Sequence, residues 1–127
     1  MQQTHLFEYA VVRIVPKVER EEFLNVGVIL YCRELNFLQV LYTLNEERLR
    51  IFCTQVDKQE LLQNLQSVER ICNGSADAGP IGHLDIAGRF RWLTATRSTI
   101  IQTSKVHPGF CTDPVETLTR LYTQLVL

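Results

Sequence analysis

The chain has 127 residues and a formal net charge of −1; 46% of its residues are hydrophobic and 21% are charged. Such a length is enough to bury a core within one domain, and we expect residues 1–127 to form a single domain. The small net charge excludes a global field that would draw the protein to nucleic acid or an anionic membrane. The sequence shows neither a run of ~18 apolar residues that could span a bilayer nor a signal peptide at its start, so we expect a cytoplasmic protein with no membrane contact.

Three extended segments are predicted in the first third of the chain. Residues 7–15 are mainly apolar on both faces, which is typical of a central strand, and Pro16 ends the segment because proline cannot donate to the ladder. Residues 26–33 and 37–43 follow as two more strands, and the short links between them favour an antiparallel meander. Gly27 inside a strand indicates a bulge or a close approach of another backbone.

The pattern then changes to a helical period. Residues 45–52 predict a short helix, and a longer helix is expected from the capping residue Asp57 to the stop signal Asn73-Gly74. Residues 74–88 contain four of the six glycines and are expected to form one long loop.

Extended character returns around residues 98–104, and Asp113 followed by Pro114 predicts the start of a last helix, with aspartate as the cap and proline at the first position. Together these elements predict an α+β fold. We expect an antiparallel sheet of four to five strands, with two to three helices packed mainly on one face.

One charged side chain, Arg13, lies inside the otherwise apolar first strand. A guanidinium buried there without a partner would be costly, so it must reach a carboxylate or carbonyl groups, or extend to the rim of the sheet. Glu22 is the expected partner because the returning chain passes close by. Two roles stay open for Arg13, a structural ion pair or half of an anion site.

A second polar segment, residues 86–112, contains no acidic residue and carries four arginine or lysine side chains. Within it, Arg89 and Arg91 alternate with aromatic residues. This composition suits stacking and phosphate contact, but it is equally typical of a solvated face beside a buried core. Both interpretations stay open.

On the strand predicted around residues 98–104, Ser98, Gln102 and Ser104 share one face, and His107 follows shortly after. Hydroxyl, amide and imidazole groups could together bind a phosphate or another anion. A serine nucleophile would also need an oriented base and an oxyanion hole, and the sequence has no GxSxG, P-loop, HExxH or GxGxxG motif. We therefore assign no catalytic residue.

The cysteines are widely spaced and form no CxxC pair; they are Cys32, Cys53, Cys72 and Cys111. We expect reduced, partly buried thiols, because no secretion signal favours disulfides. The spacing of His107 and Cys111 could suit a metal, but no second pair would complete four ligands. We expect neither a metal nor a cofactor.

Two long blocks, YAVVRIVPKVEREEFLNVGVILYC and RFRWLTATRSTIIQTSKVHPGFCTDP, resemble the bacterial domain-of-unknown-function 3037 family. In the first block the matching residues are Tyr9, Ala10, Arg13, Pro16, Arg20, Glu22, Asn25, Gly27 and Val28. In the second they are Arg89, Phe90, Trp92, Leu93, Arg97, Ser98, Gln102, Ser104, His107, Gly109, Asp113 and Pro114.

The resemblance implies no established activity. It implies a short bacterial cytoplasmic protein, often encoded beside a kinase-like protein similar to the toxin kinases of toxin–antitoxin systems. The polar motif residues give the candidate ligand-binding set, which we expect to gather at one end of the sheet: Arg13, Arg20, Glu22, Asn25, Arg97, Ser98, Gln102, Ser104 and His107.

Two functions follow as expectations. The first is a non-enzymatic accessory or interaction protein that partners a kinase-like neighbour. The alternative is a binding module for a phosphate-bearing ligand, either a nucleotide or a nucleic acid. No motif favours an enzyme, and the sequence identifies neither the ligand nor the oligomeric state.

Overall fold

The computed structural model describes residues 3–16, 22–52, 57–95 and 99–127. Within these residues it has five strands: β1 (His5–Ile14), β2 (Leu24–Cys32), β3 (Phe37–Tyr42), β4 (Ile101–Thr103) and β5 (His107–Cys111). The α-helices are α1 (Glu46–Phe52), α2 (Lys58–Asn73), α3 (Ile86–Leu93) and α4 (Pro114–Leu125). None of the described helices is long and apolar enough to cross a membrane.

The strands form one antiparallel sheet in the order β3-β2-β1-β4, and β5 also pairs with β1. The predicted antiparallel meander of the first three strands is therefore confirmed. Residues 12–14 of β1 pair with β4, whereas residues 5–9 pair with β5. β4 and β5 thus pair one after the other with the same edge of β1.

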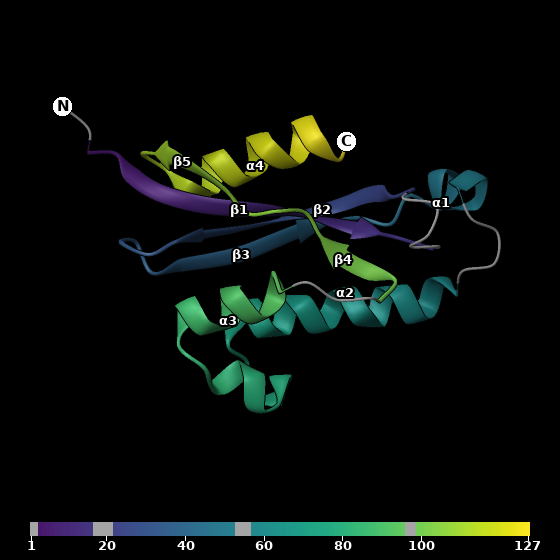
Figure 1. Ribbon diagram of the computed structural model, residues 1–127, viewed down its shortest axis with the longest axis horizontal. Helices are drawn as coiled ribbons and strands as arrows, with labels where there is room; N and C mark the ends of the chain where they lie inside the picture. Colours follow the sequence, from purple (N-terminus) through teal and green to yellow (C-terminus); the bar gives the residue numbers. More distant parts are fainter. Residues whose placement is uncertain (1–2, 17–21, 53–56, 96–98) are drawn as a thin grey trace.

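Helices cover both faces of this sheet (Figure 1). Val12 and Ile14 of β1 pack into one core with residues of α2 and α3, whereas Phe7 of β1 packs into a second core with Leu118 of α4. The expectation of a central strand with two apolar faces is met by this arrangement. The α+β class and the strand number are as predicted, but there are four helices rather than two to three, with α4 on the face opposite α2 and α3.

The predicted ends of α2 are confirmed. The side chain of Asp57 accepts hydrogen bonds from the backbone N–H groups of Gln59 and Glu60, at 3.0 and 3.3 Å. Gly74 has a left-handed conformation with φ of 64° and donates its N–H to the carbonyl of Ile71. This is a common helix end, because glycine enters the left-handed region without a Cβ clash.

The single long loop predicted for residues 74–88 is wrong. The segment contains two 3-10 helices, Ala76–Ala78 and Pro80–His83, and then the start of α3. The physical reason is the cap at Asp85, whose carboxylate accepts the N–H of Gly88 at 2.7 Å. Sequence reasoning gave more weight to the glycines than to this cap and to the apolar residues that follow at helical spacing.

A β-bulge interrupts the pairing of β1 with β2. Val12 lies opposite Gly27, but the next residue, Arg13, lies opposite Asn25, so Val26 is an extra residue on β2. Val26 packs into the same core as Val12, and the shift therefore leaves Asn25 opposite Arg13. Bulges change which way the side chains of a strand point, and this one sets a polar residue beside the half-buried Arg13.

β3 also approaches Gly27 closely. A Cβ at this position would lie 2.7 Å from the carbonyl oxygen of Leu41 and 2.9 Å from the Cβ of Tyr42. The sequence predicted either a bulge or a close backbone approach at Gly27, and the structure has both: the glycine is next to the bulge and close to β3.

We expect Gly27→Ala to lower the free energy of unfolding by about 1–3 kcal/mol, because the clash is with backbone that cannot move aside freely. Urea denaturation would measure the loss. Gln39→Ala, at an exposed position of β3, serves as the control and should change stability by less than about 0.5 kcal/mol. Equal stability of the two variants would contradict the close packing at Gly27.

Candidate functional site

Three of the predicted ligand-binding residues meet across three neighbouring strands. On β1, Arg13 lies opposite Asn25 of β2 on one side and opposite Gln102 of β4 on the other. Directly opposed residues of antiparallel strands point to the same face, and we call this set the Arg13 row. It joins the two blocks of the sequence at one end of the sheet.

The guanidinium of Arg13 lies on an aromatic ring. Its Cζ is 3.9 Å from the ring centroid of Phe23, a geometry that favours a cation–π interaction. The Nε atom is buried and has no hydrogen-bond partner among the described residues. Glu22, the expected ion-pair partner, is exposed and precedes Phe23 in the chain, and its pairing with Arg13 stays a prediction.

The side chains of Asn25 and Gln102, on either side of Arg13, form some of the hydrogen bonds that their amide groups can make. The side-chain N–H of Asn25 donates to the carbonyl of Leu125 at 3.1 Å, and Gln102 donates to the carbonyl of Thr99 at 2.8 Å. However, Oδ1 of Asn25 is buried and has no partner in the described part of the chain. Among the described residues, the row therefore contains a donor and an acceptor that are both unsatisfied, although buried polar groups are nearly always hydrogen-bonded.

Ser104 and His107 lie further along the same edge of β1. The hydroxyl of Ser104 accepts the N–H of Val11 at 2.8 Å and donates to the carbonyl of Lys105 at 2.9 Å. His107 is exposed and lies opposite Tyr9, with 5.3 Å between the two ring centroids. Ser104 thus has a structural role where the chain passes from β4 to β5, and its hydroxyl proton is engaged by a backbone carbonyl rather than by His107.

The remaining members of the predicted set are Arg20, Arg97 and Ser98, which lie outside the described residues. Their contribution to a site stays a prediction. Among the residues that the structure describes, no group of three or more His, Cys, Asp or Glu side chains could hold a metal ion.

Arg91 is exposed, as the interpretation of a solvated face expected, whereas Arg89 is half-buried. Nη1 of Arg89 donates to the carbonyls of Ile71 and Cys72 at 3.1 and 3.0 Å, and so stabilises the C-terminus of α2. Arg91 forms an ion pair with Glu8. The reason is that this segment is helical, so that the two arginines point to different neighbours.

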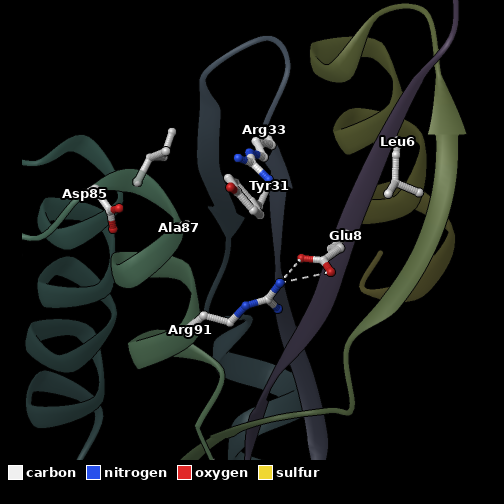
Figure 2. A pocket seen from close by; sticks show the side chains of 8 residues that line it. Leu6, Glu8, Tyr31, Arg33, Asp85, Ala87 and Arg91 are labelled. Carbon is white, nitrogen blue, oxygen red and sulfur yellow. Dashed lines mark hydrogen bonds and ion pairs between the residues drawn. The ribbon is translucent and has the colours of Figure 1, made fainter.

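A pocket of about 500 Å³ lies between α3, the end of β2 and the start of β1 (Figure 2). We call it the α3 pocket. It lies on the face of the sheet opposite α4, and its lining consists of Leu6, Glu8, Tyr31, Arg33, Asp85, Ile86, Ala87 and Arg91.

The ion pair between Glu8 and Arg91 lies inside this pocket. Nη2 of Arg91 is 2.8 Å from Oε2 of Glu8 and donates a 3.1 Å hydrogen bond to Oε1. Both side chains are partly exposed, so we expect at most about 1 kcal/mol from the pair. Sequence reasoning missed the pocket because 83 positions separate the two residues and because α3 was not predicted. The Asp85 cap was the signal that could have revealed it.

The described cysteines are buried and free: Cys32, Cys72 and Cys111. Burial raises the pKa of the Cys72 thiol to about 12, although the nearby Arg89 lowers it. Burial, followed by the neighbouring Cys32, also raises the pKa of Cys111. With raised pKa values, the thiols of Cys72 and Cys111 stay protonated at neutral pH, whereas a reactive cysteine needs a lowered pKa. They pack as small apolar residues.

Taken together, the fold and its surface define an α+β protein with two polar sites on opposite faces of one sheet. The chain belongs to the DUF3037 family of proteins of unknown function, because the family model matches residues 9–126, essentially the whole chain. No curated protein and no solved structure matches the chain.

We expect Ser104→Ala to reduce the free energy of unfolding by about 1–3 kcal/mol, because the buried N–H of Val11 would lose its acceptor. His107→Ala removes an exposed ring and should cost less than about 1 kcal/mol. Thermal and urea unfolding of both variants would test this. A greater loss of stability in His107→Ala than in Ser104→Ala would show that the roles are assigned the wrong way round.

Proposed function

We propose that the protein is a non-enzymatic accessory protein of the bacterial cytoplasm that binds a kinase-like protein encoded beside it. The observation that carries the proposal is an exposed apolar pair on the sheet. Leu6 of β1 and Phe110 of β5 lie directly opposite each other and are 49% and 72% exposed. We call this pair the Leu6–Phe110 patch. The kinase-like nature of the partner rests on the family resemblance.

The patch is suited to docking because its two side chains act as one surface. Opposed residues of antiparallel strands have Cβ atoms about 4.5–5.5 Å apart, so a partner can cover both at once. Full burial of a large apolar side chain contributes about 1.5–3 kcal/mol, and aromatic residues are enriched among those that dominate binding. Leu6 also lines the α3 pocket, so the apolar surface continues into a concave one.

The chemistry of β5 favours contact through side chains. β5 pairs with β1 and with no other described strand, so its outer side is a sheet edge. Pro108 lies in β5 and has no N–H to donate, which is one way in which edge strands avoid pairing with another chain. We therefore infer that the partner packs a folded apolar surface onto Leu6 and Phe110 instead of adding a strand.

A second candidate function, binding of a phosphate-bearing ligand, is favoured by the Arg13 row. The buried Nε of Arg13 has no acceptor among the described residues, and guanidinium groups bind phosphate oxygens with directed hydrogen bonds. Asn25 donates to the carbonyl of Leu125, and Arg48 donates to the next carbonyl, that of Val126, at 2.7 Å. A second guanidinium is thus held at the same end of α4.

For the accessory function, the tagged protein should co-purify with the kinase-like protein encoded beside it. Phe110→Glu should weaken the complex at least about tenfold, because a charge would replace the most exposed member of the patch. Ile51→Glu is the matched control, because Ile51 is 83% exposed on α1, away from the patch, and it should bind like the wild type. If the wild-type protein forms no complex at micromolar concentrations, the accessory function is disproved. If Phe110→Glu and Ile51→Glu bind equally well, the Leu6–Phe110 patch is not the docking surface.

For the alternative, fluorescent nucleotides and short DNA or RNA should bind at low salt, with a log–log slope of about one per phosphate contact. Arg13→Gln should weaken binding at least about tenfold, whereas Arg120→Gln, at an exposed position of α4, should not. Circular dichroism would verify that Arg13→Gln is folded. If no probe binds at low ionic strength, this function is excluded.

A further inference from the structure

The α3 pocket has the features of a ligand site that can be tested without a protein partner. Its volume of about 500 Å³ lies within the range of small-molecule sites, roughly 300–1,000 Å³. Three separate parts of the chain form it, namely the start of β1, the end of β2 and the first residues of α3 (Figure 2). Such a site is preformed by the fold, because each wall belongs to a regular element or its cap.

The charges of the pocket are balanced but not fully matched. Two arginines and two carboxylates line it, so their formal charges sum to zero. Glu8 and Arg91 neutralise each other. Arg33, just after β2, and Asp85, just before α3, form no ion pair with any described residue. One cation and one anion therefore remain on different walls of the same pocket.

A tyrosine hydroxyl adds a third polar group. The side chain of Tyr31 lines the pocket and is only 5% exposed, and its ring packs on Phe90 at 5.1 Å. Its hydroxyl forms no hydrogen bond with a described residue, and in Figure 2 it points into the space between β2 and α3. Because this hydroxyl borders the pocket and has no partner among the described residues, it is available to a ligand.

The rest of the lining is apolar. Leu6, Ile86 and Ala87 supply hydrocarbon surface beside the charged groups. A ligand that fits must therefore carry an anionic group for Arg33, a cationic group for Asp85 and an apolar part that reaches Leu6, Ile86 and Ala87. A polyphosphate does not meet this description, because the pocket has no net positive charge.

From these features we propose that the α3 pocket binds a small zwitterion of the amino-acid class with an apolar side chain. The carboxylate lies against the guanidinium of Arg33, where charge-assisted hydrogen bonds are strong. The ammonium lies against the carboxylate of Asp85, and the side chain packs on Leu6, Ile86 and Ala87. Asp85 keeps its capping bond to Gly88 because a carboxylate has a second oxygen.

Titration of the full-length, isotope-labelled protein with leucine, followed by NMR, tests the proposal. The amide signals of Ala87 and Arg33 should shift at millimolar leucine. Leucinamide lacks the anion and N-acetyl-leucine lacks the cation, so each should bind at least about tenfold more weakly than leucine. Inorganic phosphate should leave these signals unchanged.

Two near-isosteric variants test which charged group of the ligand each pocket residue binds. Arg33→Gln should lose the preference for leucine over leucinamide. Asp85→Asn retains a capping side chain and should lose the preference for leucine over N-acetyl-leucine. Arg120→Gln, on the other face of the sheet, should behave like the wild type.

The proposal is overturned if none of the twenty amino acids shifts these signals at millimolar concentrations. It is also overturned if leucine, leucinamide and N-acetyl-leucine bind equally, or if phosphate competes with leucine. These results do not depend on a protein partner, so they leave the accessory function to its own test.

Discussion

The pairing of β1 along both of its edges is the constraint on which the rest of this structure depends. β2 occupies one edge, while β4 and β5 share the other. Because successive residues of a strand point to opposite faces, β1 supplies Val12 and Ile14 to one core and Phe7 to the other. A single strand thus connects the α2–α3 layer, the α4 layer and residues from both ends of the chain.

The β-bulge at Val26 turns this central pairing into a polar site. It brings Asn25 opposite Arg13, at a position where strict alternation would have placed an apolar residue. The resulting buried donor and acceptor lack partners in the described part of the chain, an arrangement that folding alone does not favour. Local features that cost stability often mark functional positions, and this is the physical reason for connecting the Arg13 row with ligand binding.

The features behind the proposed functions lie on opposite faces of the sheet. On the α4 side, guanidinium and amide groups gather at the end of the helix, as the bonds of Asn25 and Arg48 to its last carbonyls show. On the α3 side, a pocket with balanced charges borders an apolar pair at the sheet edge. The described cysteines are buried and free, and none of them lines the α3 pocket or belongs to the Arg13 row.

The sequence by itself determined the three-strand meander, the capped ends of α2, the cap of α4, the α+β class and the family, because these follow from periodicity, turn residues and motifs that are local in the chain. It also identified Arg13 as a charge that needs partners. Only the tertiary structure decided that Phe23 lies under the Arg13 guanidinium, that Arg89 stabilises the end of α2, and that Glu8 and Arg91 form the wall of a pocket. These contacts join residues through a bulge, an unpredicted helix and sheet pairing, and strand register and helix orientation are set by the packing of the whole chain rather than by neighbouring residues.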